Sequence, residues 1–305
     1  MISHDPPGHL LTPEDLARLQ GSALRASRVM HGRLQGIHRS AHQGASVEFS
    51  DHKEYSPGDN LRHVDWRAVA RFDHYFVKRF EHETNANSCI VLDGSGSMAY
   101  GAQGLLTKYD YGAVLATCLG LVLLRQQDAM GAVLFDDELR AEIPPRSGIG
   151  HLRHLTEAMD RHEPRGSTAL EEALDRARFL TGKRGMIFVL SDCFLDPSIL
   201  RAALGRLSSG GHQITVLQIL DGDELDLPFA EPIDFQGLET GHRLLVEPRA
   251  IRAHYKTQLA AHLSAVQEAC LSARAQRYLV DTRTAPIEVI MGLVGRDAST
   301  HRMDR

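Results

Sequence analysis

The sequence predicts an α/β protein with a mostly parallel central sheet and helices on both faces, and three observations lead there. From residue 88 onward, short apolar runs alternate with longer helical patterns, an order typical of parallel strands joined by crossover helices. The chain has 305 residues, 43% hydrophobic and 24% charged, enough to bury a full core. Several apolar runs also stop at a polar or acidic residue, which is typical of strands that end at one edge of a sheet.

The elements follow from these patterns in chain order. Apolar, strand-length runs predict strands at 88–92, 131–136, 186–191, 213–219 and 277–282, an edge strand at 139–143 and a further strand at 243–246. Helical periodicity predicts helices at 107–126, 149–160, 168–181 and 197–208, then a short closing helix after the last strand. Before that strand, an amphipathic helix is expected to turn one stripe to the core: Ile251, Tyr255, Leu259, Leu263 and Val266. The acidic stretch 221–241 is expected to be irregular.

The part before residue 87 has a different character. Thr12 followed by Pro13 predicts the start of one helix within an N-terminal arm over 1–43. Turn signals and short apolar runs predict a strand-rich segment over 44–86. We expect this extension to pack on the α/β domain, which would occupy 87–295 and leave a tail at 296–305.

The strand end at residue 93 carries the most chemistry. Asp93, Ser95 and Ser97 are separated by glycines that let the backbone turn sharply, and residues two apart in an extended turn point the same way. Their hard oxygen atoms suit Mg²⁺ first and Mn²⁺ second. Thr168, at the start of a helix, and Asp192, after the strand 186–191, are expected to join them at the same edge.

The charge of these five residues suggests which further ligand the ion would bind. Two carboxylates roughly balance a divalent cation, so the remaining ligand is expected to be an Asp or Glu of a partner, or water. No nucleophile paired with a base is visible beside them. We therefore expect a docking site without catalysis.

The five residues resemble the metal-ion-dependent adhesion site of von Willebrand factor A-like domains, whose pattern is Asp-x-Ser-x-Ser, then a Thr, then an Asp. All five positions are present without substitution. The resemblance implies the Rossmann-type α/β fold of those domains.

A second resemblance lies upstream. The stretch from Tyr55 to Trp66 reads Tyr-x-Pro-Gly-Asp-x-x-Arg-x-x-Asp-Trp, followed by Ala70-Arg71, and it is similar to domain of unknown function family 58. Many members have Asp where this chain has Asn60. The likeness runs from about residue 20 to 295. It implies an adaptor or co-chaperone that works with a MoxR-type AAA+ ATPase in protein remodelling or maturation.

Other readings of the same loop stay open. One is a Mg²⁺-dependent enzyme acting on a phosphorylated or dinucleotide substrate, because Gly94-x-Gly96-x-x-Ala99 matches the dinucleotide fingerprint. That motif requires an acidic residue about 20 positions later, at the end of the second strand, whereas Asp136 lies 43 positions after Asp93. An aspartyl-phosphate phosphatase would have Asp in place of Ser95. A polar turn without a ligand is the third possibility.

Charge and composition indicate the class of partner and the compartment. The net charge of −5 argues against a general nucleic-acid binder. Residues 25–80, with ten Lys or Arg against six Asp or Glu, carry +4, either as a basic docking face or as internal ion pairs. The longest apolar run, 113–124, is too short to span a bilayer, and no signal peptide is visible. With four scattered cysteines read as reduced thiols, we expect a cytoplasmic protein that does not enter the membrane.

Overall fold

The computed structural model describes residues 48–54, 76–81, 87–125 and 128–299. Residues 30–85 form a unit separate from that of residues 86–305. In the smaller unit the described part is an antiparallel pair, β1 (Glu48–Glu54) and β2 (Phe76–Glu81), with Phe49 opposite Phe80. The helix expected behind Thr12 and the Tyr55–Trp66 stretch lie outside the described residues. The expected domain limits, and the packing of the extension on the α/β domain, stay predictions.

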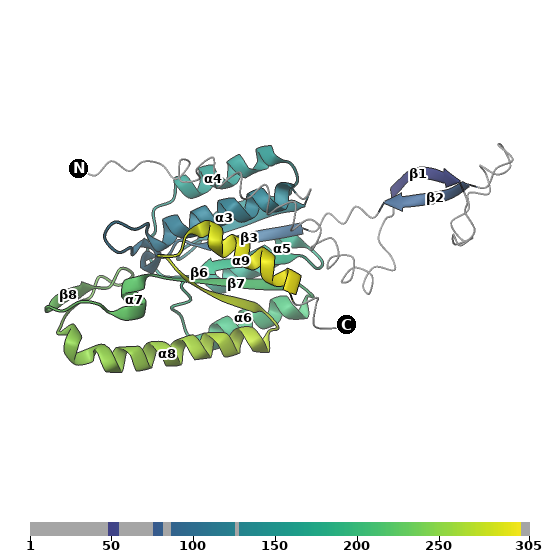
Figure 1. Ribbon diagram of the computed structural model, residues 1–305. Coiled ribbons are helices and arrows are strands. Elements are labelled where there is room, and N and C mark those ends of the chain that lie inside the picture. The colour runs from purple at the N-terminus through teal and green to yellow at the C-terminus, as the bar shows by residue number, and fades with distance from the viewer. Residues whose placement is uncertain (1–47, 55–75, 82–86, 126–127, 300–305) are drawn as a thin grey trace. The chain divides into compact units, whose positions relative to one another are not determined.

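The larger unit contains a six-stranded sheet in the order β10-β7-β6-β3-β4-β5 (Figure 1). All neighbouring strands are parallel except β4 and β5, which are antiparallel. The strands are β3 (Asn87–Asp93), β4 (Ala129–Phe135), β5 (Leu139–Arg146), β6 (Met186–Ser191), β7 (Gln213–Leu220) and β10 (Gln276–Asp281). This confirms the predicted fold class and the edge position of β5.

Helices cover both faces of this sheet. On one face α3 packs with α4 and α9, and on the other α5 packs with α6, which packs with α8 (Figure 1). Their bounds are α3 (Lys108–Arg125), α4 (Leu152–Asp160), α5 (Leu170–Thr181), α6 (Pro197–Ser209), α8 (Pro248–Ser272) and α9 (Pro286–Ser299), with short 3-10 turns η3 (Gly96–Ala99) and η4 (Ile149–His151).

The central strand β3 is buried on both faces. Cys89 and Val91 belong to the core beneath α5 and α6, while Leu92 lies close to Gly112 of α3 on the other side. A strand between two helical layers has no polar face, which is why its sequence is a continuous apolar run with no alternation. Its polar residues lie at its two ends, Asn87 and Ser88 at the start and Asp93 at the carboxyl end.

The region after β7 differs from the expectation of irregular structure. It contains a short helix, α7 (Gly222–Asp226), and a hairpin of β8 (Ile233–Gln236) with β9 (Arg243–Val246), outside the central sheet (Figure 1). Asp221 caps α7 through a capping box with Glu224. The strand expected at 243–246 is β9. Elements of four or five residues are too short to show a hydrophobic period, so the sequence pattern did not reveal α7 or β8.

The expected core stripe of α8 is correct only in its second half. Leu259 and Val266 are buried, but Ile251 is 38% exposed. The first turns of α8 extend beyond the sheet, toward the hairpin, and therefore have less of the sheet to cover.

Within the described part of the chain, no helix has both the length and the apolar character needed to cross a membrane.

Candidate metal site

Asp93, at the end of β3, is the centre of the candidate site. Its carboxylate is buried, and Oδ1 accepts a hydrogen bond from the Ser95 backbone N–H at 2.9 Å. Oδ2 accepts two hydroxyl hydrogen bonds, from Thr168 at 3.2 Å and from Ser191 at 2.7 Å. Three segments distant in sequence therefore meet at one carboxylate, as expected for strand ends along one edge.

The loop after Asp93 is fixed by its backbone. The N–H of Gly94 donates to the Phe135 carbonyl at 2.7 Å, and the N–H of Gly96 donates to the Gly166 carbonyl at 2.9 Å. A Cβ on Gly96 would lie 2.5 Å from the Leu238 carbonyl oxygen, so the tip of the β8–β9 hairpin requires glycine here.

The remaining hydroxyls complete the expected group. Ser95 Oγ and Ser97 Oγ are 3.3 Å apart, consistent with the same-side arrangement inferred from their spacing. Thr168 lies ahead of α5 but does not cap it; the N-cap residue is Ala169, and the Thr168 hydroxyl bonds to Asp93. Asp93, Ser95, Ser97 and Thr168 are thus connected by hydrogen bonds.

Asp192, the fifth expected residue, is close to this group but is held by an unexpected partner. Its Oδ2 lies 2.7 Å from Nζ of Lys108, the first residue of α3, and its Oδ1 accepts the backbone N–H of Phe194 at 3.1 Å. Lys108 Nζ also contacts Glu224 Oε1 of α7 at 2.6 Å. The Lys108 side chain is completely buried, and the Phe194 ring centroid lies 5.0 Å from Nζ.

The charges shift the proton affinities of these groups. Burial, together with the negative charge of Asp192, raises the pKa of Asp93 to about 6, although the hydrogen bonds from Ser191 and Ser95 oppose the shift. Burial opposes the charge on Lys108, but the two carboxylates outweigh it and raise its pKa. Burial raises the pKa of Glu224 despite its contact with Lys108.

A third strand-end aspartate behaves in the opposite way. Asp136, directly after β4, is buried, and Arg140 Nε lies 2.6 and 2.7 Å from its two carboxylate oxygens. Although burial acts to raise it, these hydrogen bonds hold the pKa of Asp136 below its usual value.

The donor set fits a hard divalent cation. Asp93 offers a buried carboxylate whose contacts, among the described residues, are hydroxyl and amide groups only, and the other nearby donors are hydroxyl oxygens. No cluster of three His, Cys, Asp or Glu suited to a metal occurs in the described ranges, so a soft or borderline metal such as zinc lacks its ligands there. Ser95, Ser97 and Thr168 could hold the ion with Asp93, and Asp192 lies beside them with one carboxylate oxygen held by Lys108.

Sequence reasoning missed Lys108, Glu224 and Ser191 as members of this site. Ser191 could have been suspected, because it ends β6 immediately before Asp192. Lys108 and Glu224 gave no signal, since a Lys at a helix start and a Glu in an acidic stretch are usually exposed.

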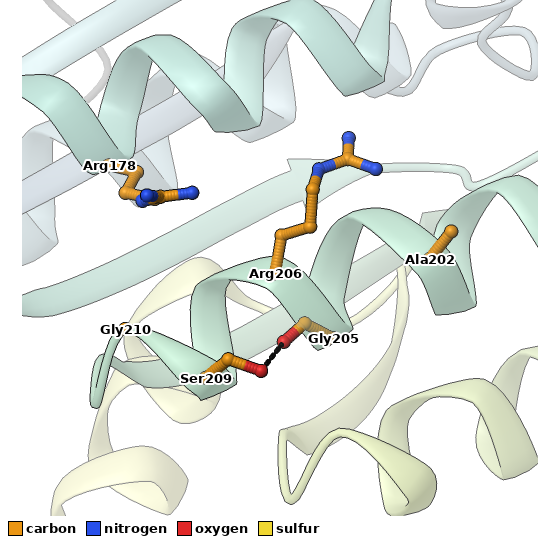
Figure 2. A pocket seen from close by; sticks show the side chains of 6 residues that line it. All are labelled: Arg178, Ala202, Gly205, Arg206, Ser209 and Gly210. Carbon is orange, nitrogen blue, oxygen red and sulfur yellow. Dashed lines mark hydrogen bonds between the residues drawn. The ribbon is translucent and has the colours of Figure 1, made fainter.

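A separate surface depression lies elsewhere. It has a volume of about 540 Å³ and lies between α5 and α6, lined by Arg178, Ala202, Gly205, Arg206, Ser209 and Gly210 (Figure 2). Arg206 on its wall is paired with Asp175 and Glu171, and the Ser209 hydroxyl bonds to the Gly205 carbonyl. These polar groups are already satisfied within the chain.

The comparison with known families agrees with the upstream motif. Residues 51–265 match the family described as protein of unknown function DUF58. The chain belongs to the DUF58 family. Uncharacterized protein Rv1480 of Mycobacterium tuberculosis is 26% identical over 269 residues, covering 86% of this chain and 84% of that protein. The uncharacterized protein Mb1516 of Mycobacterium bovis gives the same figures.

Two solved structures are among those similar to this DUF58 protein. Conserved hypothetical protein BatB from Bacteroides thetaiotaomicron is 17% identical with a TM-score of 0.47, covering 70% of this chain and 99% of that one. The SpRpn10 VWA domain is 14% identical with a TM-score of 0.40, covering 68% and 94%. The parallel sheet with its antiparallel edge strand β5 and helices on both faces is the α/β architecture that the sequence predicts.

Proposed function

We propose that this DUF58 protein is a non-catalytic adaptor that binds a protein partner through a Mg²⁺ ion, with Mn²⁺ as the second choice. The ion would be held by Asp93, Ser95, Ser97 and Thr168, with Asp192 beside them. When bound, it would supply the positive charge that the buried Asp93 lacks and an open coordination position for a partner's Asp or Glu.

The observation that carries the proposal is that, among the described residues, two of three strand-end aspartates pair with a basic side chain and the third does not. Asp136 is paired with Arg140 and Asp192 with Lys108, but no Lys or Arg in the described part of the chain contacts Asp93. A buried carboxylate without a counter-ion is costly. Asp93 is therefore the position at which an added cation would stabilise the protein most.

The surroundings favour a protein partner over a small substrate. Phe194 bonds through its backbone to Asp192, the hairpin tip at Leu238 lies over Gly96, and both side chains are more than one-third exposed. On β9 of the same hairpin, Leu244 and Leu245 are 65% and 75% exposed. Exposed apolar residues beside a polar site are typical of protein interfaces.

The alternative, a Mg²⁺-dependent enzyme acting on a phosphorylated or dinucleotide substrate, has less support. Among the described residues, no histidine hydrogen-bonds to the Ser95 or Ser97 hydroxyl, and the carboxylate beside Ser95, that of Asp93, already accepts hydrogen bonds from Thr168 and Ser191. Burial raises the pKa of the Cys193 thiol, the nearest cysteine, far from a nucleophilic range.

The partner we propose is a MoxR-type AAA+ ATPase, or a client protein that the pair remodels or matures in the cytoplasm. This part of the proposal comes from the resemblance of DUF58 members to partners of such ATPases. The negative net charge of the chain makes nucleic acid an unfavourable ligand.

Co-elution with a MoxR-type ATPase from the same genome tests the proposal. Because the ATPase itself uses Mg²⁺, variants discriminate better than chelation. Asp93→Asn should abolish the complex. Asp196→Asn is the matched control, because it removes a nearby carboxylate but keeps an N-cap that Asn satisfies equally well. A complex that survives Asp93→Asn would contradict metal-mediated docking, and turnover of phosphorylated compounds by the chain alone would favour the enzyme.

A further inference from the structure

Lys108 is the feature of this site that a simple metal-binding loop does not require. Its ammonium group is buried, lies 2.7 Å from Asp192 and 2.6 Å from Glu224, and is covered by the Phe194 ring. A buried lysine keeps its charge only when carboxylates compensate it, and here two do so. The site therefore contains a permanent positive charge before any metal binds.

We propose that Lys108 limits how tightly this chain binds a divalent cation, by holding Asp192 and repelling the ion. This inference rests on the proposed function and concerns the strength of metal binding. The ammonium competes with the metal for the same carboxylate oxygen of Asp192. In a buried site such a like charge acts through a low effective dielectric and is little screened by salt.

Glu224 determines how much of the positive charge of Lys108 remains uncompensated beside Asp192. Its Oε1 contacts the ammonium, while its Oε2 accepts the backbone N–H of Asp221 at 2.8 Å. The Glu224 carbonyl accepts the Tyr255 hydroxyl at 2.6 Å. The glutamate is thus fixed from α7 and α8, and it offsets part of the lysine charge from a constant position.

Two substitutions then have opposite effects on metal affinity. Lys108→Met removes the repelling charge and frees Asp192, so the Mg²⁺ dissociation constant should fall about tenfold. Glu224→Gln leaves the lysine less compensated, so the same constant should rise several-fold. The double variant removes both charges together and should return toward the wild-type value.

Isothermal titration with Mg²⁺, repeated with Mn²⁺, measures these constants, and thermal melting with and without the metal gives a second readout. Arg153→Met is the charge-matched control for Lys108→Met, because it removes a positive charge from an exposed ion pair with Glu157 on α4. Asp196→Asn is the control for Glu224→Gln. Neither control should alter the affinity.

The outcomes separate the two proposals. Opposite shifts in the two variants support the inference, and so does binding that is detected only after Lys108→Met. If both variants weaken binding alike, Lys108 has a structural role and the inference fails while the metal site remains. If neither the wild type nor Lys108→Met binds either metal, the proposed function itself fails, and the inference with it. Should Lys108→Met not fold, Glu224→Gln alone decides, because unchanged or tighter binding would overturn the inference.

Discussion

Asp93 and Asp136 follow the same pattern: each lies at the carboxyl end of one of two paired parallel strands, and each carboxylate is buried. Their surroundings have opposite effects. Asp136 receives a guanidinium from Arg140 on β5, and its pKa is lowered. Asp93 receives one amide and two hydroxyl groups, and its pKa is raised to about 6.

This difference shows what makes one strand end a structural feature and the other a candidate site. A carboxylate paired with an arginine of its own chain already has a counter-ion, and this pair fixes the turn between β4 and β5. A carboxylate surrounded by neutral donors is positioned but not neutralised, so it retains a capacity for an external cation. The predictions below test this distinction.

The largest change in stability is expected when the ion pair between Asp136 and Arg140 is broken. Arg140→Met would remove the closer of the two arginines that pair with the buried Asp136 and leave only Arg165, whose Nε lies 3.6 Å from Oδ2. It should lower the free energy of unfolding by about 3 kcal/mol, at the low end for a broken buried pair because Arg165 remains. Urea denaturation measures this value. Arg153→Met is the control: it breaks an exposed pair with Glu157 on α4 and should change stability by less than about 0.5 kcal/mol. Similar losses in both variants would mean that burial of Asp136 does not decide the cost.

Removing the charge of Asp93, in contrast, is expected to increase the stability of the protein. Because its folded pKa of about 6 exceeds the ordinary value of 3.8 for an aspartate, the folded state binds this proton more tightly than the unfolded state. Its contribution to stability is therefore fully present below about pH 4 and is lost as the pH rises through about 6, a loss of roughly 3 kcal/mol at most. In EDTA at pH 8, Asp93→Asn should stabilise the protein by about 2 kcal/mol, since Asn carries no charge.

Urea denaturation at pH 8 and pH 4 measures this second prediction. The gain should shrink toward zero at pH 4, where Asp93 of the wild type is itself protonated. A destabilised Asp93→Asn protein at pH 8 would show that the charged carboxylate is already compensated, and the contrast with Asp136 would be lost.

The third prediction concerns competition between a proton and the metal at Asp93. Below pH 6 the carboxyl group must lose its proton before it can bind a cation, so Mg²⁺ affinity should fall about tenfold per pH unit there, equivalent to about 1.4 kcal/mol. Titrations at pH 5, 6 and 7.5 measure it. Near pH 6, in two buffers of different ionisation enthalpy, they should also reveal proton release. A flat profile would remove Asp93 from the ligand set.

The smallest expected change is in Mg²⁺ affinity, and it distinguishes between the two hydroxyls that bond to Asp93 Oδ2. Thr168→Ala removes a proposed ligand and should weaken Mg²⁺ binding by about 1 kcal/mol. Ser191→Ala removes only a hydrogen bond to Asp93, so it should raise the Asp93 pKa further while weakening metal binding less at pH 8. Titration of both variants under identical conditions provides the comparison. Equal losses would indicate that Thr168 acts only by orienting Asp93.

The sequence by itself determined the alternation of strands and helices, the edge strand β5, and the meeting of Asp93, Ser95, Ser97 and Thr168. These features depend on local patterns: an apolar run for a strand buried on both faces, and polar residues where such strands must end. It predicted β9 at 243–246 but not α7 or the partner strand β8, because elements of four or five residues show no period.

The tertiary structure alone decided which buried charges meet. Lys108 and Glu224 are 116 positions apart, yet both contact the region of Asp192, and only the packing of α3 and α7 against the end of β6 brings them there. The pairing of Asp136 with Arg140, four positions later, is by contrast local and depends on the turn between β4 and β5. Ionic pairing depends on distances between side chains from different elements, and a one-dimensional pattern contains no record of those distances.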